Sequence, residues 1–430
     1  MSKFDLLGVY LAAGAQEVRV GSLVRDESGI VRFDIDEAYI ELGQYRPILS
    51  SSLLRYGDED QTVALLRDGS MRKPGRDIHP WFANLLPEGA LKDLVLRGMP
   101  TGSTTDFDVL RWLGGDLPGA VLVRGEEANP LPVTLPTEPS TTSSGIRFSL
   151  AGVQLKMSMQ KQDQRLTFPA ISGMGDIIAK LPSERHRSLP EVEYSSMMLA
   201  KAVGVEVPDF ELVPISDLVG VEAGLLKGGD LALAVKRFDR QEGGRRVHME
   251  DFLQVLGDQP DRKYSAANQE TIMAIATRLG GGTQAFLQSV RRVAANILMG
   301  NTDAHTKNWS LWYPTRSEGQ LSPAYDIVAS VVYDPSDKMA LRFRGTHDSH
   351  VITSQRFQRA ASMCGVPEKR ARKEVRHVVE QAADEWRNLL QDMPMPEDYA
   401  KTLIARAQTL ALTKEFESEC SKRTGASYIL

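Results

Sequence analysis

Hydrophobic and polar residues alternate along residues 4–36, with the period of two that is typical of half-buried β-strands. Polar turn residues, including the run at 26–29, interrupt the alternation, so a small antiparallel sheet is expected. The expected strands lie at 6–11, 18–24 and 31–35. Two helices and a further strand are predicted at 80–86, 106–113 and 119–123. The first helix would begin at Pro80 and stop before Pro87, as the restricted backbone of proline requires.

The composition changes abruptly between residues 127 and 145, where four prolines are followed by a run of serine and threonine at 140–144. Such a stretch is typical of a linker. It predicts a domain boundary after a β-rich region at 1–126.

Beyond the linker, two strand-like pieces flank a small-residue turn at Ala151-Gly152. Strands at 176–180 and 231–236 bracket a helix at 191–203. The rest of the chain has mainly helical spacing, with helices expected at 249–256, 266–279, 284–299, 355–364, 367–390 and 396–417. The pattern therefore predicts an α+β protein whose C-terminal part is mostly α-helical.

Length, charge and cysteine content narrow the class of protein. A chain of 430 residues is too long for one typical core, so two or three domains are expected. The net charge of -5 creates no global basic field for nucleic acid. Cys364 and Cys420 form neither a disulfide framework nor a CxxC metal site, and no apolar run approaches the length of a membrane span. We therefore expect a soluble cytoplasmic protein with no membrane partner, because Asp5 also stands where a signal peptide would be apolar.

Asp303, Asn308 and Asp326 follow one another in the order used by phosphoryl-transfer enzymes. The first aspartate of such a set orients or deprotonates a hydroxyl, and the asparagine and second aspartate hold Mg²⁺ against the phosphates of ATP. The set follows an amphipathic helix at 284–299, which would support the loop rigidly. The alternative is an ordinary polar loop in which Asp303 caps a turn and Asn308 bonds the backbone.

Lys180 ends an apolar strand, where a kinase places an ammonium group on the α- and β-phosphates. Glu193 shares a helix face with Met197 and Ala200, and a carboxylate on a buried stripe needs a partner. Lys180 would provide it, although Glu193 could equally flank the stripe in water. The turn at Ala151-Gly152 could close its backbone N–H groups over phosphates, or be a plain hairpin.

A basic face on the helix at 367–390 is the remaining charged feature, and it consists of Lys369, Arg370, Arg372 and Lys373. Most such faces are simply solvated. The alternative is a contact with the phosphate backbone of DNA, which would be independent of sequence and would weaken with salt.

Taken together, five motifs resemble the HipA-type toxin kinases, the serine/threonine-kinase components of type II toxin–antitoxin modules. The motifs are those at 149–156, 178–182, 236–240, 301–308 and 325–327. The segments 84–87, 113–116 and 119–121 resemble the N-terminal coupling domain of the same family. The likeness therefore runs through nearly the whole chain.

The resemblance implies a protein kinase-like fold with two lobes and an N-terminal β-rich domain. The implied divisions are a coupling domain at 1–126, a linker at 127–145, a kinase N-lobe at 146–240 and an α-helical C-lobe at 241–430. ATP and Mg²⁺ are the implied cofactors, with Asp303 as the catalytic base and Asn308 and Asp326 as metal ligands. The implied nucleotide contacts are a phosphate loop of Ala151, Gly152, Val153, Gln154, Leu155 and Lys156, then Lys180, the hinge residues Lys236, Arg237 and Phe238, and His305, Thr306, Lys307, Asn308 and Asp326.

The resemblance also implies regulation and partners. Ser149 matches the serine that family members autophosphorylate, which ejects the phosphate loop and inactivates the kinase. A phosphate dianion there would be repelled from the phosphates of ATP. The implied partners are a dimeric helix-turn-helix antitoxin, operator DNA mainly through that antitoxin, and a protein substrate such as an aminoacyl-tRNA synthetase. Two alternatives stay open: a small-molecule kinase, and a catalytically idle co-repressor bound to the antitoxin on DNA.

Overall fold

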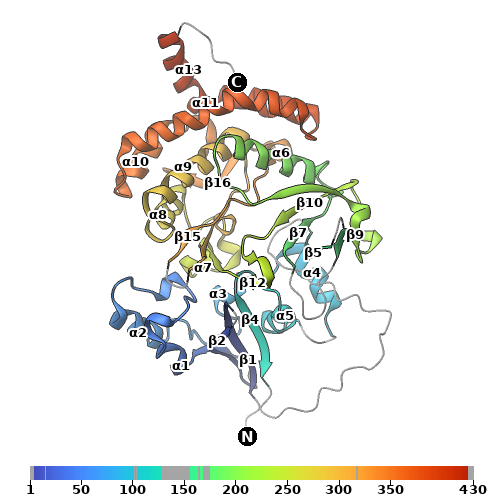
Figure 1. The fold of residues 1–430 in the computed structure, drawn as a ribbon, viewed down its shortest axis with the longest axis vertical. Coiled ribbons are helices and arrows are strands. Elements are labelled where there is room, and N and C mark those ends of the chain that lie inside the picture. The colour runs from blue at the N-terminus through green and yellow to red at the C-terminus, as the bar shows by residue number, and fades with distance from the viewer. Residues whose placement is uncertain are drawn as a thin grey trace.

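The computed structural model describes residues 4–14, 16–100, 102, 104–126, 155–162, 165–167, 175–315 and 318–424. We call residues 4–126 the N-terminal region and residues 155–424 the C-terminal region. In Figure 1 the N-terminal sheet lies at one end of the molecule and the long helix α11 at the other, with the largest sheet between them. Within these ranges no helix combines the length and the apolar character that crossing a bilayer requires.

The N-terminal region is built on an antiparallel sheet with the strand order β3-β2-β1-β4. Its strands are β1 (Asp5–Ala13), β2 (Gln16–Arg25), β3 (Val31–Ile35) and β4 (Val121–Glu126). The helices of this region are α1 (Glu37–Ile40), α2 (Glu59–Arg67), α3 (Pro80–Ala83), α4 (Gly89–Gly98) and α5 (Asp106–Leu113). The predicted sheet and the helix at 106–113 are confirmed. The predicted helix at 80–86 is too long, because the side-chain amide of Asn84 donates to the Pro80 carbonyl oxygen at 2.9 Å and closes the turn.

The central sheet has the strand order β8-β10-β7-β5-β6-β9. Its strands are β5 (Lys156–Gln162), β6 (Arg165–Thr167), β7 (Ile177–Lys180), β8 (Phe210–Pro214), β9 (Leu218–Val219) and β10 (Leu231–Lys236). Alternate residues of β10 enter two different hydrophobic cores, because successive side chains of a strand point to opposite faces. Leu233 and Val235 join the core of the C-terminal helices, whereas Ala232 and Ala234 join the core of the N-terminal region. Both regions therefore pack on one sheet.

The remaining elements of the C-terminal region are mostly helical, as predicted. They are α6 (Leu189–Ala202), α7 (Phe252–Leu256), α8 (Gln269–Leu279), α9 (Gly282–Met299), α10 (Ser354–Met363), α11 (Glu368–Asp392), α12 (Glu397–Thr409) and α13 (Ala411–Thr424). Short strands complete it: β11 (Arg240–Gln241), β12 (Arg245–Arg246), β13 (His248–Asp251), β14 (Ser310–Tyr313), β15 (Gln320–Leu321), β16 (Lys338–Phe343) and β17 (Thr346–Asp348).

Two further predicted helices, both in the C-terminal region, differ from the structure. The segment 249–251 belongs to strand β13, which pairs with β14, and Asp251 caps the shorter helix α7 by accepting a hydrogen bond from the Gln254 backbone N–H. The predicted helix at 396–417 is two helices. Leu410 lies between them with an extended backbone (φ -68°, ψ 140°) and a fully buried side chain, so packing of that leucine interrupts the helix.

Glu250 on β13 joins the two regions through a buried network. Its carboxylate accepts hydrogen bonds from the Ser50 hydroxyl at 2.7 Å, the Ser51 backbone N–H at 2.7 Å and the Trp81 indole N–H at 3.1 Å. Tyr313 of β14 donates a further bond at 2.6 Å. A buried carboxylate is tolerated when it is fully hydrogen-bonded, so this network fixes the N-terminal region against the C-terminal region.

Candidate active site

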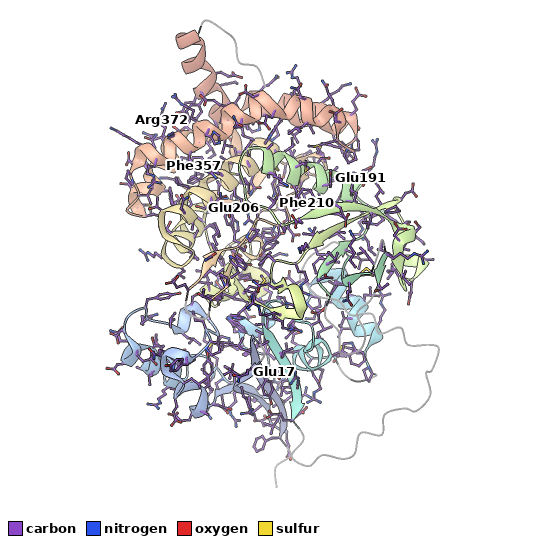
Figure 2. All side chains as sticks on the ribbon, in the orientation of Figure 1. Glu17, Glu191, Glu206, Phe210, Phe357 and Arg372 are labelled. Carbon is purple, nitrogen blue, oxygen red and sulfur yellow. The ribbon has the colours of Figure 1, made fainter. Side chains whose placement is uncertain are left out.

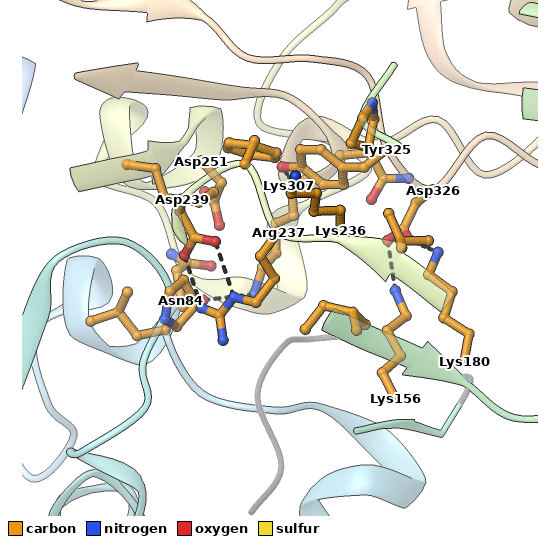
Figure 3. Close-up of a pocket in the computed structure, with 18 of the residues that line it drawn as sticks. Asn84, Lys156, Lys180, Lys236, Arg237, Asp239, Asp251, Lys307, Tyr325 and Asp326 are labelled. Carbon is orange, nitrogen blue, oxygen red and sulfur yellow. Dashed lines mark hydrogen bonds and ion pairs between the residues drawn. The ribbon is translucent and has the colours of Figure 1, made fainter. Parts of the chain in front are cut away.

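A cleft lies between β7 and β10 of the central sheet, the loop after α9, and the edge of the N-terminal region (Figure 3). It encloses about 980 Å³ of space that is continuous with solvent. One part of its lining is apolar, with Ile178, Met197, Pro208, Val235, Phe238 and Met249. The other part is charged or polar, with Lys156, Lys180, Lys263, Lys307, Asn308 and Asp326. This division suits a ligand with a flat apolar base and an anionic tail.

Lys180 lies at the centre of the charged part. Its ammonium group donates to Glu193 of α6 and to Asp326, and the Lys156 ammonium reaches the second carboxylate oxygen of Asp326 at 2.7 Å. Figure 3 shows both lysines pointing at Asp326. The structure thus brings together the lysine and the glutamate that the sequence pairs, and adds the second aspartate.

These contacts keep both Asp326 and Lys180 ionised. Burial by itself would raise the pKa of Asp326, but Lys156 and Lys180 hold it well below its usual range. Burial would also lower the pKa of Lys180, but Asp326 and Glu193 outweigh burial and raise it. Asp326 has a φ of 53°, in the left-handed region that few residues other than glycine adopt. The loop conformation therefore directs an ionised carboxylate into the cleft.

The loop after α9 carries Asp303 and Asn308. Helix α9 ends at Gly300, whose φ of 71° favours glycine, and Asn301 then accepts a hydrogen bond from the Asp303 backbone N–H at 3.1 Å. The side-chain amide of Asn308 donates to the Asp303 carbonyl oxygen at 3.0 Å, so its oxygen is the atom that would bind a metal ion. Asp303 is exposed, and its carboxylate accepts a hydrogen bond from the Tyr264 hydroxyl at 2.7 Å.

The other residues predicted in this loop have different environments. His305 is buried in the lining of the cleft, and burial lowers its pKa to about 4, so the ring is neutral at pH 7. The Thr306 hydroxyl is fully buried and donates to the Lys263 carbonyl oxygen at 2.9 Å, outside the lining of the cleft. Lys307 lines the cleft but is paired with Glu88 of the N-terminal region.

The three predicted hinge residues all line the cleft, but their side chains have different surroundings. Phe238 faces the cleft, with its ring centroid 5.8 Å from that of Tyr325. Lys236 is exposed at the end of β10, 3.9 Å from Asp209. The Arg237 side chain is buried in the lining of the cleft, where Asp239 and Asp116 hold its guanidinium group.

Arg237 belongs to a group of buried charges that we call the hinge cluster: Asp116, Arg237, Asp239 and Arg240. Arg237 and Asp239 of this cluster also line the cleft. The Arg237 guanidinium lies 2.8 Å from Asp239 and 3.1 Å from Asp116, and Arg240 lies 2.7 Å and 2.9 Å from the same carboxylates. Gly119 donates its backbone N–H to Asp239 at 2.7 Å. Asp116 and Gly119 belong to the N-terminal region, so this cluster is a second connection between the regions.

Several predicted residues lie outside the described residues: Ser149, Ala151, Gly152, Val153 and Gln154. Leu155 is described, and its carbonyl oxygen accepts a hydrogen bond from the Leu181 backbone N–H at 3.0 Å. Of the predicted phosphate loop, only Lys156 therefore has a defined place in the cleft.

The basic face predicted for DNA lies on α11. Lys369, Arg370 and Lys373 are exposed, whereas Arg372 is half-buried, 3.9 Å from Glu415 of α13 and 5.4 Å from the ring of Phe416. In Figure 2, Arg372 lies at the end of the molecule opposite Glu17 of the N-terminal sheet. A DNA contact here would involve a surface remote from the N-terminal sheet.

Sequence reasoning missed the residues that other segments bring to the cleft. Asn84, Leu85 and Pro118 of the N-terminal region line it, and so do Lys263 and the buried Asp251. Burial raises the pKa of Asp251 to about 7. No spacing in the sequence relates these positions to 303–308, so only the packing of the regions shows them.

The lining fits a magnesium nucleotide. Mg²⁺ needs oxygen ligands and usually takes only one or two from the protein, which Asn308 and Asp326 can provide. Among the described residues, no group of three or more His, Cys, Asp or Glu side chains is placed to hold a metal ion by itself. The residues therefore fit a metal held jointly with phosphate oxygens rather than an all-protein metal site.

Comparisons with known proteins agree with this chemistry. The sequence pattern of the HipA-like C-terminal domain matches residues 148–386, and that of the HipA N-terminal domain matches residues 11–124. A putative kinase of Sinorhizobium fredii, Y4dM, is 36% identical, over 92% of this chain and 96% of its own. The serine/threonine-protein kinase toxin HipA of Shewanella oneidensis is 26% identical, over 67% of this chain and 71% of its own.

The solved complex of Shewanella oneidensis HipA, HipB and operator DNA contains a chain with the same fold. Its TM-score is 0.71 at 21% identity, and the match covers 96% of this chain and 99% of that one. The predicted two-lobed kinase-like fold with an N-terminal β-rich domain is thereby confirmed. The domain matches and the 36% identical relative together show that this chain belongs to the HipA-like family of toxin kinases.

Proposed function

We propose that this protein is an ATP- and Mg²⁺-dependent serine/threonine protein kinase that acts as the toxin of a toxin–antitoxin module. The observation that carries the proposal is the pair of ion pairs made by Lys180, one with Asp326 and the other with Glu193. A lysine held by a helical glutamate, beside a metal-binding aspartate, is the arrangement that kinases need before phosphoryl transfer.

Each residue has a proposed role in transfer. The apolar part of the cleft binds the adenine base, and Lys156 and Lys180 bind the phosphates. Bound MgATP supplies the phosphoryl group and the metal that neutralises its charge, and Asn308 and Asp326 would hold that metal. Asp303 accepts the proton of the acceptor hydroxyl. The phosphoryl group would pass directly from ATP to the acceptor oxygen, with ADP as the leaving group. Because none of these residues bonds to the phosphoryl group, they lower the barrier through positioning, charge and acceptance of the proton.

The exposure of Asp303 favours a protein acceptor over an enclosed small molecule. A macromolecular hydroxyl can reach an exposed carboxylate at the rim of a cleft. We therefore propose serine or threonine side chains as the acceptors, on a translation component such as an aminoacyl-tRNA synthetase. A small-molecule kinase would instead be expected to enclose its acceptor.

The proposed partner is a helix-turn-helix antitoxin of the HipB kind, which would bind operator DNA as a dimer. The support is that the HipA chain of the same fold was solved with HipB and its operator. The exposed Lys369, Arg370 and Lys373 are the residues proposed for any direct DNA contact. Autophosphorylation of Ser149 is the proposed means of inactivation.

The function is tested by intact mass after incubation with ATP and Mg²⁺. Wild type should gain the mass of a phosphate, and neither Asp303→Asn nor Ser149→Ala should. Since a general base contributes about 10²–10⁴-fold, Asp303→Asn should lose transfer by that factor while keeping ATP binding by calorimetry.

Asp261→Asn is the matched control, because it neutralises an exposed carboxylate in a neighbouring segment. It should transfer phosphate like wild type. Undiminished transfer by Asp303→Asn would refute the role of that residue. A protein that transfers no phosphate to itself or to lysate proteins would instead be an idle co-repressor.

A further inference from the structure

Glu88 of the N-terminal region joins two lysines of the C-terminal region at the cleft. Its Oε1 atom lies 2.6 Å from the Lys307 ammonium, and its Oε2 atom lies 2.9 Å from the Lys263 ammonium. Lys307 also donates to the carbonyl oxygen of Asn84 at 3.2 Å. One carboxylate from the N-terminal region therefore holds two cations that line the active site.

The three side chains are shielded enough for this contact to be strong. The Lys307 side chain is 4% exposed, that of Lys263 is 12% exposed and that of Glu88 is 24% exposed. Burial would raise the pKa of Glu88, but Lys307 and Lys263 lower it, so the carboxylate is ionised at pH 7. A buried ammonium group without a partner is costly, so neither lysine would keep this position without Glu88.

Lys307 transmits its position to both proposed metal ligands. It directly precedes Asn308 in the chain, and its carbonyl oxygen accepts a hydrogen bond from the Tyr325 hydroxyl at 2.9 Å. Tyr325 in turn directly precedes Asp326. A shift of Lys307 would therefore displace the side chains on both sides of the metal position.

Lys263 is connected in a similar way to Asp303, the proposed catalytic base. Its carbonyl oxygen accepts hydrogen bonds from the backbone N–H and the hydroxyl of Thr306, at 3.2 Å and 2.9 Å. The next residue, Tyr264, donates its hydroxyl proton to Asp303 at 2.7 Å. Lys263 therefore connects Glu88 with the base, as Lys307 connects it with the metal ligands.

From these contacts we infer that Glu88 is a positioning residue for phosphoryl transfer, which fixes Asp303 relative to Asn308 and Asp326. The inference rests on the proposed kinase function. It means that the N-terminal region completes the active site and is not merely attached to the kinase. Because catalysis depends on the placement of reacting groups to within about 1 Å, a loosened Glu88 contact should act mainly on the rate of transfer.

The kinetic test uses Glu88→Gln, which keeps the shape of the side chain and removes its charge. ADP formation from MgATP would be measured with myelin basic protein as acceptor. We expect kcat to fall by about tenfold or more while the KM for ATP changes less than threefold. Glu88→Asp should restore part of the rate, because it returns the charge on a shorter side chain.

Ser50→Ala is the matched control. It removes one hydrogen bond to Glu250 across the same boundary between regions, away from the two lysines. It should keep the wild-type kcat. Equal losses of kcat in Glu88→Gln and Ser50→Ala would mean that only docking of the N-terminal region matters, and would overturn the inference.

Hydrogen exchange followed by mass spectrometry provides a readout that does not need activity. Glu88→Gln should exchange faster than wild type in peptides covering 260–265 and 303–308, and Ser50→Ala should not. Unchanged exchange in these peptides would overturn the positioning role even if activity fell. If wild type transfers no phosphate, the proposed function fails and the catalytic role of Glu88 fails with it, and the exchange comparison then tests only whether Glu88 holds the two segments in place.

Discussion

Asp239, which is buried, and Asp326, which is half-buried, are each held by two cations, but the cations are of different kinds. Asp239 is paired with Arg237 and Arg240 in the hinge cluster, whereas Asp326 is paired with Lys156 and Lys180 in the cleft. In both cases burial would raise the pKa of the carboxylate, and the cations hold it below its usual range. The charges are alike, so the difference lies in the chemistry of the partners.

The partners of Asp239 are guanidinium groups with several fixed donors. Arg240, for example, also donates to the carbonyl oxygens of Gly119 and Leu117, both at 2.9 Å. Such a planar fork is held by several protein oxygens at once, although the Nε atom of Arg240 has no hydrogen-bond partner among the described residues. It exchanges partners less readily than an ammonium group does. The ammonium groups at Asp326 are compact and sit on flexible stems at the edge of an open cleft, so they can turn to a phosphate. The comparison teaches that the type of cation distinguishes a carboxylate that joins the two regions from the carboxylate proposed to bind the metal.

Of the variants that test this comparison, Asp326→Asn should have the largest effect, and that effect is on catalytic activity. Asp326→Asn should lower kcat by about 10²–10³-fold or more, because the substitution removes the negative charge that attracts Mg²⁺ and the two lysines. Phosphate transfer to myelin basic protein would measure it. Asp334→Asn, an exposed change eight residues later, should leave the rate unaltered. A rate near that of wild type in Asp326→Asn would exclude this residue from the metal site.

Asp239→Asn should act on stability instead. It leaves Arg237 and Arg240 short of a buried counter-charge, and breaking a buried pair costs about 3–5 kcal/mol. Urea denaturation would show the loss, while kcat of the folded fraction should stay within about threefold. A stability equal to that of wild type would mean that the guanidinium groups are satisfied without this carboxylate.

Asp239→Asn should also change how the free energy of unfolding depends on pH. Since the pKa of Asp239 is lower in the folded protein than in the unfolded chain, its contribution is complete above pH ~4 and is lost as pH falls below that value. The free energy of unfolding should therefore fall less steeply with acid in Asp239→Asn than in wild type. A parallel pair of curves would assign the acid sensitivity to other carboxylates.

Exchanging the cations gives a smaller and more specific test. Lys180→Arg puts a fixed fork beside Asp326 and should reduce kcat by about tenfold, because guanidinium and ammonium groups are not interchangeable at such sites. Arg240→Lys should cost about 1–3 kcal/mol of stability through lost hydrogen bonds, with kcat unchanged. The paired measurements are kinetics and urea denaturation on both variants. Equal effects of the two exchanges on rate would remove the distinction between the clusters.

Much of the fold could be predicted from local pattern. Period-two alternation located β1, β2 and β3, and helical spacing located α8 and α9. The errors came where tertiary contacts override local preference: the strand β13 pairs with β14, and Leu410 is buried between two helices. Neither the pairing partner nor the buried environment is visible in a sequence window.

For the candidate site, too, local sequence pattern predicted some features and tertiary contacts decided the others. The order of Lys180, Asp303, Asn308 and Asp326 along the chain, together with the resemblance of the surrounding motifs to a kinase family, predicted phosphoryl transfer as the chemistry. The sequence did not predict that Asp116 and Asp239 hold the Arg237 guanidinium or that Thr306 supports Lys263. The placement of the phosphate loop stays a prediction, since residues 151–154 lie outside the described residues.

By itself, then, the sequence determined the residue types of the site and the α+β class, because side-chain chemistry and periodicity are local properties. Only the tertiary structure decided that Glu88 meets Lys263 and Lys307, 175 and 219 residues away. Such contacts depend on two regions packing on opposite faces of one sheet. The partner of a buried charge is set by that packing, and no spacing rule along the chain contains it.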